Sequence, residues 1–217
     1  MTATAVIFDL GRVVLEWFPE RAFTPVLPEA EVPVFFERVG FFSWNAGLDA
    51  GGSFAEAEDE LSARFPDDRE AILAYRRNFG LTVPGYVKGT PEVIAELQRN
   101  GVRLGALSNW SGETFGAVRN RFGVLDGFEA VVVSGIDGVA KPDPASFALA
   151  CERLGVEPGD TAFVDDSPVN VAAANAFGLH GVLFTDAGRL RDDLAALGLP
   201  VGASDEAVAQ GQAPAPA

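Results

Sequence analysis

The chain has 217 residues, a formal net charge of -15 at pH 7, one cysteine and one histidine. This length suits one core with a small inserted subdomain, and it is too short for two full-sized independent domains. A phosphate-backbone binder needs a clustered basic face, which the acidic balance argues against. We therefore expect neither nucleic acid nor an anionic membrane as a partner.

The cysteine and the histidine each narrow the possible chemistry. A lone Cys151 allows neither an intramolecular disulfide nor a multi-cysteine metal cage, which favours a reducing cytoplasm as the location. The only histidine, His180, stands before a short apolar run, and we expect it to have a structural role at a strand edge. Catalysis is then expected to use carboxylates, hydroxyls, lysine or a metal.

The first predicted element is a short apolar run, Val6-Ile7-Phe8, that ends at Asp9 and turns through Gly11. Such a run predicts a buried strand with Asp9 at its carboxyl end. An apolar run interrupted this early predicts neither a signal peptide nor a membrane span. Ligands of open α/β sheets bind at that edge, which favours a functional carboxylate over one that merely starts a turn.

Residues 17–85 are predicted to form an all-helical cap. Apolar periodicity predicts three helices in it, at residues 31–39, 53–65 and 67–79. Ser53 and Glu56 form a capping box for the second helix. Residues 45–52 are expected to form a Gly-rich loop, and we expect Trp44 or its neighbours in this loop to face the substrate.

Strands and helices alternate through the rest of the chain. The expected strands cover residues 102–107, 130–133, 161–164 and 181–184. The expected helices cover residues 90–100, 111–122, 143–154, 168–177 and 190–197. This alternation predicts a Rossmann-like α/β core, formed by residues 1–16 and 86–200, with a parallel sheet and helices on both faces. Residues 201–217, rich in Ala, Gly, Pro and Gln, are expected to form a disordered tail.

Polar side chains follow directly on three of the predicted strands, and a lysine follows a fourth by a short loop. These residues are Asp9, Ser108, Asn109, Lys141, Asp165 and Asp166. The carboxyl ends of parallel strands meet at one edge of a sheet, so the pattern predicts a crevice lined by these groups.

Three aspartates in one crevice repel one another and raise at least one carboxyl pKa unless positive charge intervenes. Lys141 supplies one such charge, which is too little for three carboxylates. Mg²⁺ fits the deficit, because it binds carboxylates, waters and phosphate oxygens. A metal and a lysine facing Asp9 favour attack by its carboxylate on phosphorus, which gives an aspartyl-phosphate.

These residues resemble the haloacid dehalogenase-like hydrolase superfamily, in the helical-cap group with an Asp-Leu-Gly first motif. The four matching motifs are Phe8-Asp9-Leu10-Gly11, Leu107-Ser108-Asn109, Lys141-Pro142, and Val164-Asp165-Asp166 with Asn170. The resemblance implies that Asp9 is the nucleophile, and that Asp9, the backbone carbonyl of Gly11, and Asp166 hold Mg²⁺.

The same resemblance implies roles for the other motif residues. Ser108 and Asn109, beside Gly11, would bind the phosphoryl oxygens of the substrate. Lys141 would neutralise negative charge, and Asp165 would orient Lys141 or a metal-bound water. Asn170 would either brace this loop or serve as an ordinary capping residue.

The resemblance breaks at Gly11. Most phosphatases of this superfamily carry a second aspartate there, two residues after the nucleophile, as general acid for the leaving group. A subgroup that includes sugar-phosphate phosphatases has Asp-Leu-Gly instead. Glu16 is a nearby candidate for the missing acid, and a solvated or hinge position is the alternative for it.

Two rival functions remain open, and the first follows from the missing aspartate. The 2-haloacid dehalogenases of the superfamily also lack it, attack carbon and use no metal. That function predicts an arginine early in the cap, where Arg21 is the candidate, and it leaves Asp165-Asp166 unexplained. The other rival is a non-catalytic regulator that binds phosphate on the same fold.

We therefore predict a Mg²⁺-dependent phosphatase that acts on a small phosphorylated metabolite, such as a sugar phosphate, through a phospho-Asp9 intermediate. Its partner is a small-molecule phosphate ester, and its location is the cytoplasm. The chain is expected to be a monomer or a homodimer.

Overall fold

The computed structural model describes residues 3–202 and contains one five-stranded sheet. Its strands are β1 (Ala5–Phe8), β2 (Arg103–Ser108), β3 (Ala130–Val133), β4 (Thr161–Asp165) and β5 (His180–Leu183). The order across the sheet is β3-β2-β1-β4-β5, and every neighbouring pair is parallel. The predicted Rossmann-like α/β core is confirmed. The expected tail lies outside the described residues from residue 203 onward.

Strand β1 is central because both of its faces are apolar. Val6 and Phe8 pack into one hydrophobic cluster, and Ala5 and Ile7 pack into a second cluster on the opposite face. Alternate residues of a strand point to opposite faces, so a four-residue apolar run supplies both layers. Asp9 follows this buried run directly and is thereby fixed at the carboxyl edge of the sheet.

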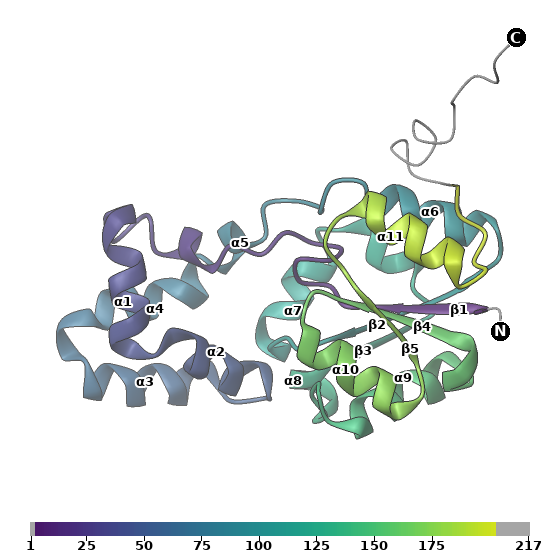
Figure 1. Cartoon of the computed structure of the whole chain (residues 1–217). Coiled ribbons are helices and arrows are strands. Elements are labelled where there is room, and N and C mark those ends of the chain that lie inside the picture. Colours follow the sequence, from purple (N-terminus) through teal and green to yellow (C-terminus); the bar gives the residue numbers. More distant parts are fainter. Residues whose placement is uncertain (1–2, 203–217) are drawn as a thin grey trace, which may run out of the picture.

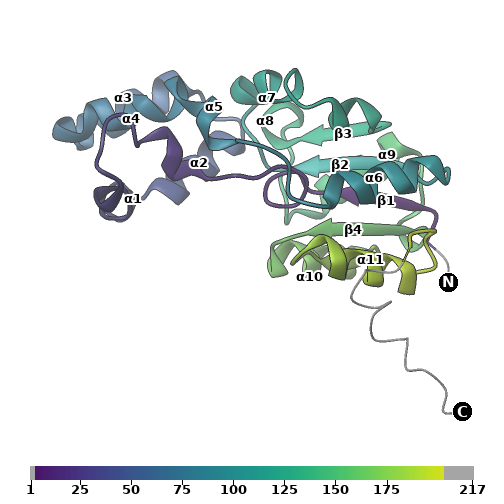
Figure 2. The same cartoon turned by 90° about the horizontal axis from the view of Figure 1, so that it is seen from above.

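Helices cover both faces of the sheet (Figures 1 and 2). One face carries α6 (Thr90–Arg99) and α11 (Ala187–Ala196), and the other carries α9 (Pro144–Leu154) and α10 (Pro168–Phe177). The start of α9 follows from its sequence, because the Asp143 carboxylate accepts the Ala145 N–H at 2.8 Å just before Pro144. Two further helices, α7 (Gly112–Arg119) and α8 (Ser134–Asp137), lie at the end of the sheet nearest the insert.

The segment inserted after β1 is all-helical, as predicted. It contains α1 (Val32–Val39), α2 (Phe41–Asp49), α3 (Phe54–Arg64), α4 (Arg69–Arg77) and α5 (Phe79–Thr82). Figure 1 shows these helices as a lobe beside the carboxyl ends of the strands. Aromatic rings form much of the core of this lobe: Phe36 stacks on Phe41 with ring centroids 4.1 Å apart, and Phe23 stacks on Tyr75.

The prediction of a loop at residues 45–52 was wrong for residues 45–49, because helix α2 continues to Asp49. Gly40 adopts the left-handed conformation that ends α1 and begins α2. Gly47 costs roughly 0.5–1 kcal/mol inside a helix, and burial of Phe41 and Leu48 on the same helix offsets this cost. Trp44 donates to the carbonyl of Ala57 and packs in the aromatic core of the lobe.

The insert is joined to the core by two chain segments that run side by side. The Glu16 N–H donates to the Gly85 carbonyl at 2.9 Å, and the Val87 N–H donates to the Val14 carbonyl at 3.0 Å. The Phe18 N–H donates to the Thr82 carbonyl in the same way. This pairing places Glu16 in the connection, which is the hinge position weighed for it. None of the helices within residues 3–202 has the length and apolar character needed to span a membrane.

The backbone packs closely around Gly135 and leaves little room for a side chain. A Cβ on Gly135 would lie 2.5 Å from the Gly112 nitrogen and 2.7 Å from the Trp110 carbonyl oxygen. Overpacking against backbone costs roughly 1–3 kcal/mol, so Gly135→Ala is expected to lower the Tm by roughly 3–10 °C. Gly116→Ala is the control, since a Cβ there meets nothing within 4 Å. Calorimetry measures both variants, and equal Tm values would contradict the prediction.

Candidate active site

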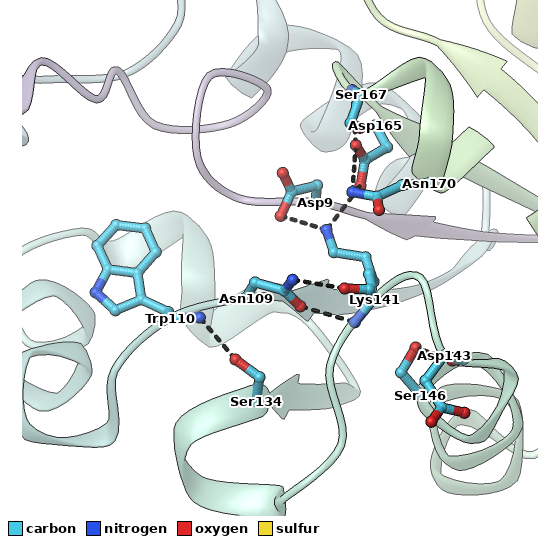
Figure 3. A network of polar contacts seen from close by, with 10 residues as sticks. All are labelled: Asp9, Asn109, Trp110, Ser134, Lys141, Asp143, Ser146, Asp165, Ser167 and Asn170. Atoms are coloured by element: carbon cyan, nitrogen blue, oxygen red, sulfur yellow. Dashed lines mark hydrogen bonds and ion pairs between the residues drawn. The ribbon is translucent and has the colours of Figure 1, made fainter. Parts of the chain in front are cut away.

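A buried lysine lies between two buried aspartates at the carboxyl edge of the sheet (Figure 3). The Lys141 Nζ is 2.8 Å from Asp9 Oδ1 and 2.7 Å from Asp165 Oδ2. Asp9 follows β1 and Asp165 ends β4, and these strands are neighbours with Phe8 in register with Val164. The parallel pairing therefore brings together two carboxylates that are more than 150 residues apart in sequence.

Asn109 holds Lys141 in place. The side-chain amide of Asn109 accepts the Lys141 N–H and donates to the Lys141 carbonyl, both at 2.9 Å. Figure 3 shows this two-point contact between the residue after β2 and the loop that carries the lysine. The amide expected to bind phosphoryl oxygens is thus engaged with protein backbone, and it fixes the position of the lysine.

Asp165 is itself braced by the following helix. Its Oδ1 accepts the Ser167 N–H at 2.8 Å, and both of its oxygens accept from Asn170 Nδ2 at 3.1 Å. Asn170 lies in the first turn of α10, and bracing is the role the structure gives it. Because its oxygens also face Lys141, Asp165 is well placed to orient the ammonium.

The site holds more negative charge than its lysine compensates. Burial raises the pKa of Asp9 to about 6, although Lys141 opposes the rise. Burial and the neighbouring Asp165 also raise the pKa of Asp166. Burial disfavours the Lys141 ammonium, but the carboxylates of Asp9 and Asp165 outweigh this effect and hold its pKa above the usual value. A further cation at this site would favour the ionised form of these carboxyl groups.

The donor set fits a hard divalent cation. Carboxylate oxygens of Asp9, Asp165 and Asp166 lie within 4.8 Å of one another. Oxygen ligands of this kind suit Mg²⁺, which also accepts waters and phosphate oxygens. Arg12 pairs with Asp166 at 3.9 Å, and about half of its side chain is exposed, so it compensates the buried carboxylates weakly.

These groups line one cavity of about 150 Å³ between the sheet edge and the inserted helices. The core residues lining it include Asp9, Gly11, Ser108, Asn109, Lys141 and Asp166. All of the site residues expected from the sequence therefore meet here, except that Asp165 lies behind Lys141. The insert contributes Trp17, Asn45, Asp49, Tyr75 and Phe79.

A family model of the haloacid dehalogenase-like hydrolases matches residues 3–178. The chain belongs to this family. Ribulose-1,5-bisphosphate 5-phosphatase of Halopiger xanaduensis is 30% identical over 203 residues, which cover 84% of each chain. Flavin mononucleotide hydrolase 1 of Arabidopsis thaliana is 30% identical over 145 residues, which cover 66% of this chain and only 59% of that protein.

Solved structures of the haloacid dehalogenase-like family share this fold. A family enzyme from Bacteroides thetaiotaomicron, solved in complex with magnesium and inorganic phosphate, superposes with a TM-score of 0.66 at 21% identity. The match covers 85% of this chain and 95% of that chain. This likeness supports the order and packing of the elements that carry the site.

Asp49 lies in the segment 45–52 that was expected to face the substrate, but the sequence analysis did not single out its carboxyl as a cavity residue. It ends α2, and burial raises the pKa of its carboxyl to about 7, with Asp9 adding to the rise. Hydrogen bonds from Ser111 and Asn45 oppose it. The available signal was the spacing of Asn45 and Asp49, which share a face only if the segment is helical. Because a loop was predicted at these positions, the two side chains were not expected to share a face.

Three other candidate residues lie away from the cavity. Glu16 lines a separate surface depression together with Lys88, and Glu16 is not among the described residues that line the active cavity. Arg21 is exposed, with its guanidinium 4.6 Å from the centroid of the Phe18 ring. His180 begins the edge strand β5 and donates from Nε2 to the Gly159 carbonyl at 2.7 Å, which is the structural position expected for it.

The raised pKa of Asp49 predicts a pH-dependent stability difference. The unfolded chain ionises near the ordinary pKa of 3.8 and the native chain near 7, so native stability falls as pH rises between these values. Asp49→Asn removes this loss. We expect its Tm, relative to wild type, to rise by roughly 3–8 °C from pH 5 to pH 8.

Calorimetry at both pH values tests this, with exposed Asp160→Asn as the matched control. A Tm difference for Asp49→Asn that stays constant with pH, or that matches the control, would show that the native environment does not perturb this carboxyl.

Proposed function

We propose that the chain is a Mg²⁺-dependent phosphatase that hydrolyses the phosphate ester of a small metabolite through a phospho-Asp9 intermediate. The observation that carries the proposal is the contact between Asp9 and Lys141, 2.8 Å apart, beside the Asp166 carboxylate in one cavity. The phosphatase named among its relatives supports the same reaction class.

In this mechanism the Asp9 carboxylate attacks phosphorus and the ester P–O bond breaks. The Lys141 ammonium offsets negative charge on Asp9 and on the phosphoryl group. The Ser108 hydroxyl, buried at the end of β2, donates to a phosphoryl oxygen. Asp165 orients Lys141, and Asn109 acts mainly by fixing the backbone of that lysine. Water then hydrolyses the acyl phosphate and regenerates Asp9.

The residues that would hold Mg²⁺ are Asp9, Asp166 and the backbone carbonyl of Gly11, with Asp165 beside them. When bound, the ion supplies the positive charge that the site lacks and neutralises phosphoryl oxygens. This assignment rests on the three clustered carboxylates and on the raised pKa values of Asp9 and Asp166.

Substrate choice falls to the inserted lobe. We assign residues 17–85 to a cap and residues 1–16 and 86–200 to the core, with the paired segments near Glu16 and Gly85 as the connection. A cavity of about 150 Å³ that the cap partly closes suits a small ester such as a sugar phosphate. We also propose that the protein is located in the cytoplasm and is a monomer or a homodimer.

The dehalogenase alternative is less well supported. A solved L-2-haloacid dehalogenase shares the fold, so the fold alone does not choose between the reactions. Arg21, the arginine expected for that chemistry, is exposed and does not line the cavity in the part of the chain described. Asp166, proposed here as a metal ligand, also has no task in a reaction that uses no metal.

Asp9→Asn is expected to lower kcat/KM for p-nitrophenyl phosphate by roughly 10³-fold or more, because the nucleophile is lost. Excess chelator should abolish wild-type turnover, and added Mg²⁺ should restore it. Asp160→Asn, an exposed aspartate, is the control and should retain activity.

Three outcomes of this assay count against the proposal. They are full activity of Asp9→Asn, metal-free release of chloride from 2-chloropropionate, and phosphate binding without turnover of any ester in a metabolite panel. The second would establish the dehalogenase and the third the regulator.

Metal binding can be tested apart from turnover. Asp166→Asn is expected to weaken Mg²⁺ binding by roughly 10–100-fold, because it removes one of the three clustered carboxylates. Titration calorimetry with Mg²⁺ measures the affinity, and Asp160→Asn is again the control. Unchanged affinity in Asp166→Asn would remove this residue from the metal site.

A further inference from the structure

The cavity lacks the usual proton donor for the leaving group. At Gly11, where most family phosphatases carry the acid, a Cβ would meet nothing within 4 Å, so the space is open. Release of an alkoxide without a proton is slow, and general acid catalysis contributes roughly 10²–10⁴-fold. Another group of the cavity must supply this proton if the chain hydrolyses alkyl phosphates.

Among the described residues that line the cavity, three have carboxyl side chains: Asp9, Asp49 and Asp166. Asp9 is taken as the nucleophile, and Asp166 as a metal ligand. We infer that Asp49, at the end of α2 in the inserted lobe, donates the proton to the leaving oxygen. This inference rests on the proposed phosphatase function and assigns a catalytic residue that lies outside the four family motifs.

Asp49 is held from both sides of the cavity. On the core side, its Oδ1 accepts the Ser111 N–H at 3.0 Å, and its backbone carbonyl accepts the Ser134 hydroxyl. On the cap side, its Oδ2 accepts from Asn45 Nδ2 at 2.7 Å, and Asn45 in turn accepts the Tyr75 hydroxyl at 2.8 Å. The carboxyl is therefore fixed at the cavity only while the cap contacts the core.

The surroundings allow both protonation states that a general acid needs. Burial, with a smaller effect of Asp9, raises the pKa of Asp49 to about 7, so the protonated acid is present near neutrality. The donors Ser111 and Asn45 then stabilise the carboxylate left after proton transfer. Asp9, Arg12, Lys141 and Asp166 line the same cavity, and Tyr75, Glu113 and Asp137 lie on the nearby helices α4, α7 and α8.

Asp49 recovers the donated proton before the end of each turnover. Asp9 forms a bond to phosphorus as the P–O bond to the leaving group breaks, and the leaving oxygen takes the Asp49 proton and departs as an alcohol. Water then attacks the phosphorus of phospho-Asp9 and gives its proton to the Asp49 carboxylate. Inorganic phosphate leaves, and both carboxyl groups return to their starting states.

Leaving-group chemistry tests the assignment. A nitrophenolate departs with little help from an acid, whereas an alkoxide needs the proton. With Mg²⁺ present, Asp49→Asn is expected to lower kcat for glycerol 2-phosphate by roughly 10²–10⁴-fold and for p-nitrophenyl phosphate by less than about tenfold. Activity on the aryl ester shows separately that the phosphatase function stands.

A rescue variant and a control sharpen the test. Gly11→Asp added to Asp49→Asn is expected to restore much of the turnover of the alkyl ester, because the open space at Gly11 admits a new acid. Asp160→Asn, at an exposed aspartate outside the cavity lining, is the control. Turnover of both esters should be unchanged in this variant.

The pH dependence of wild-type turnover tests the assignment without any substitution. Turnover of the alkyl ester should fall as pH rises through the pKa of Asp49, while turnover of the aryl ester should not show this limb. Equal loss on both esters in Asp49→Asn, no loss on either, or the same alkaline limb for both esters would overturn the assignment. Inactivity of the wild type on every ester would overturn the phosphatase function, and this inference with it.

Discussion

The ammonium of Lys141 is the interaction on which the site depends. It lies between the buried carboxylates of Asp9 and Asp165, and without it two negative charges would face each other with no counter-charge. The parallel pairing of β1 and β4 sets the distance between the carboxylates, and Asn109 sets the position of the lysine. Asp9, the proposed nucleophile, is therefore held by the fold itself, before any substrate enters.

One lysine does not balance three clustered carboxylates, so the site keeps an excess of negative charge that the proposed metal would offset. Burial raises the pKa values of both Asp9 and Asp166. Ionisation of these carboxyl groups therefore lowers the free energy of unfolding. A divalent cation bound beside these carboxylates would offset their charge, whereas a phosphoryl group alone, being negative itself, would add to it. The imbalance therefore favours a phosphate ester only when a cation is bound as well.

The core could be predicted from sequence because its signals are local. A buried run such as Val6-Ile7-Phe8 has few alternatives to a central strand, and polar residues at several strand ends then share one edge. The position of Asp49 could not be predicted in this way. Its helix contains glycine, and its contacts to Ser111 and Ser134 are made across more than 60 residues of sequence. The hydrogen bonds between Asn109 and Lys141 are also non-local, since these residues are 32 positions apart.

The two halves of the molecule divide the reaction between them. Strand ends of the core carry the groups that would act on phosphorus in the proposed mechanism, and these positions are fixed by sheet register. The insert carries Asn45, Asp49 and Tyr75, which face the side from which the leaving group departs in the proposed mechanism. Asp49 belongs to the insert and hydrogen-bonds to Ser111 and Ser134 of the core, so the proposed proton donor is in place only when the two parts are in contact. If the proposal holds, changes in the insert would alter which alcohol is released, while the groups around Asp9 would stay in place.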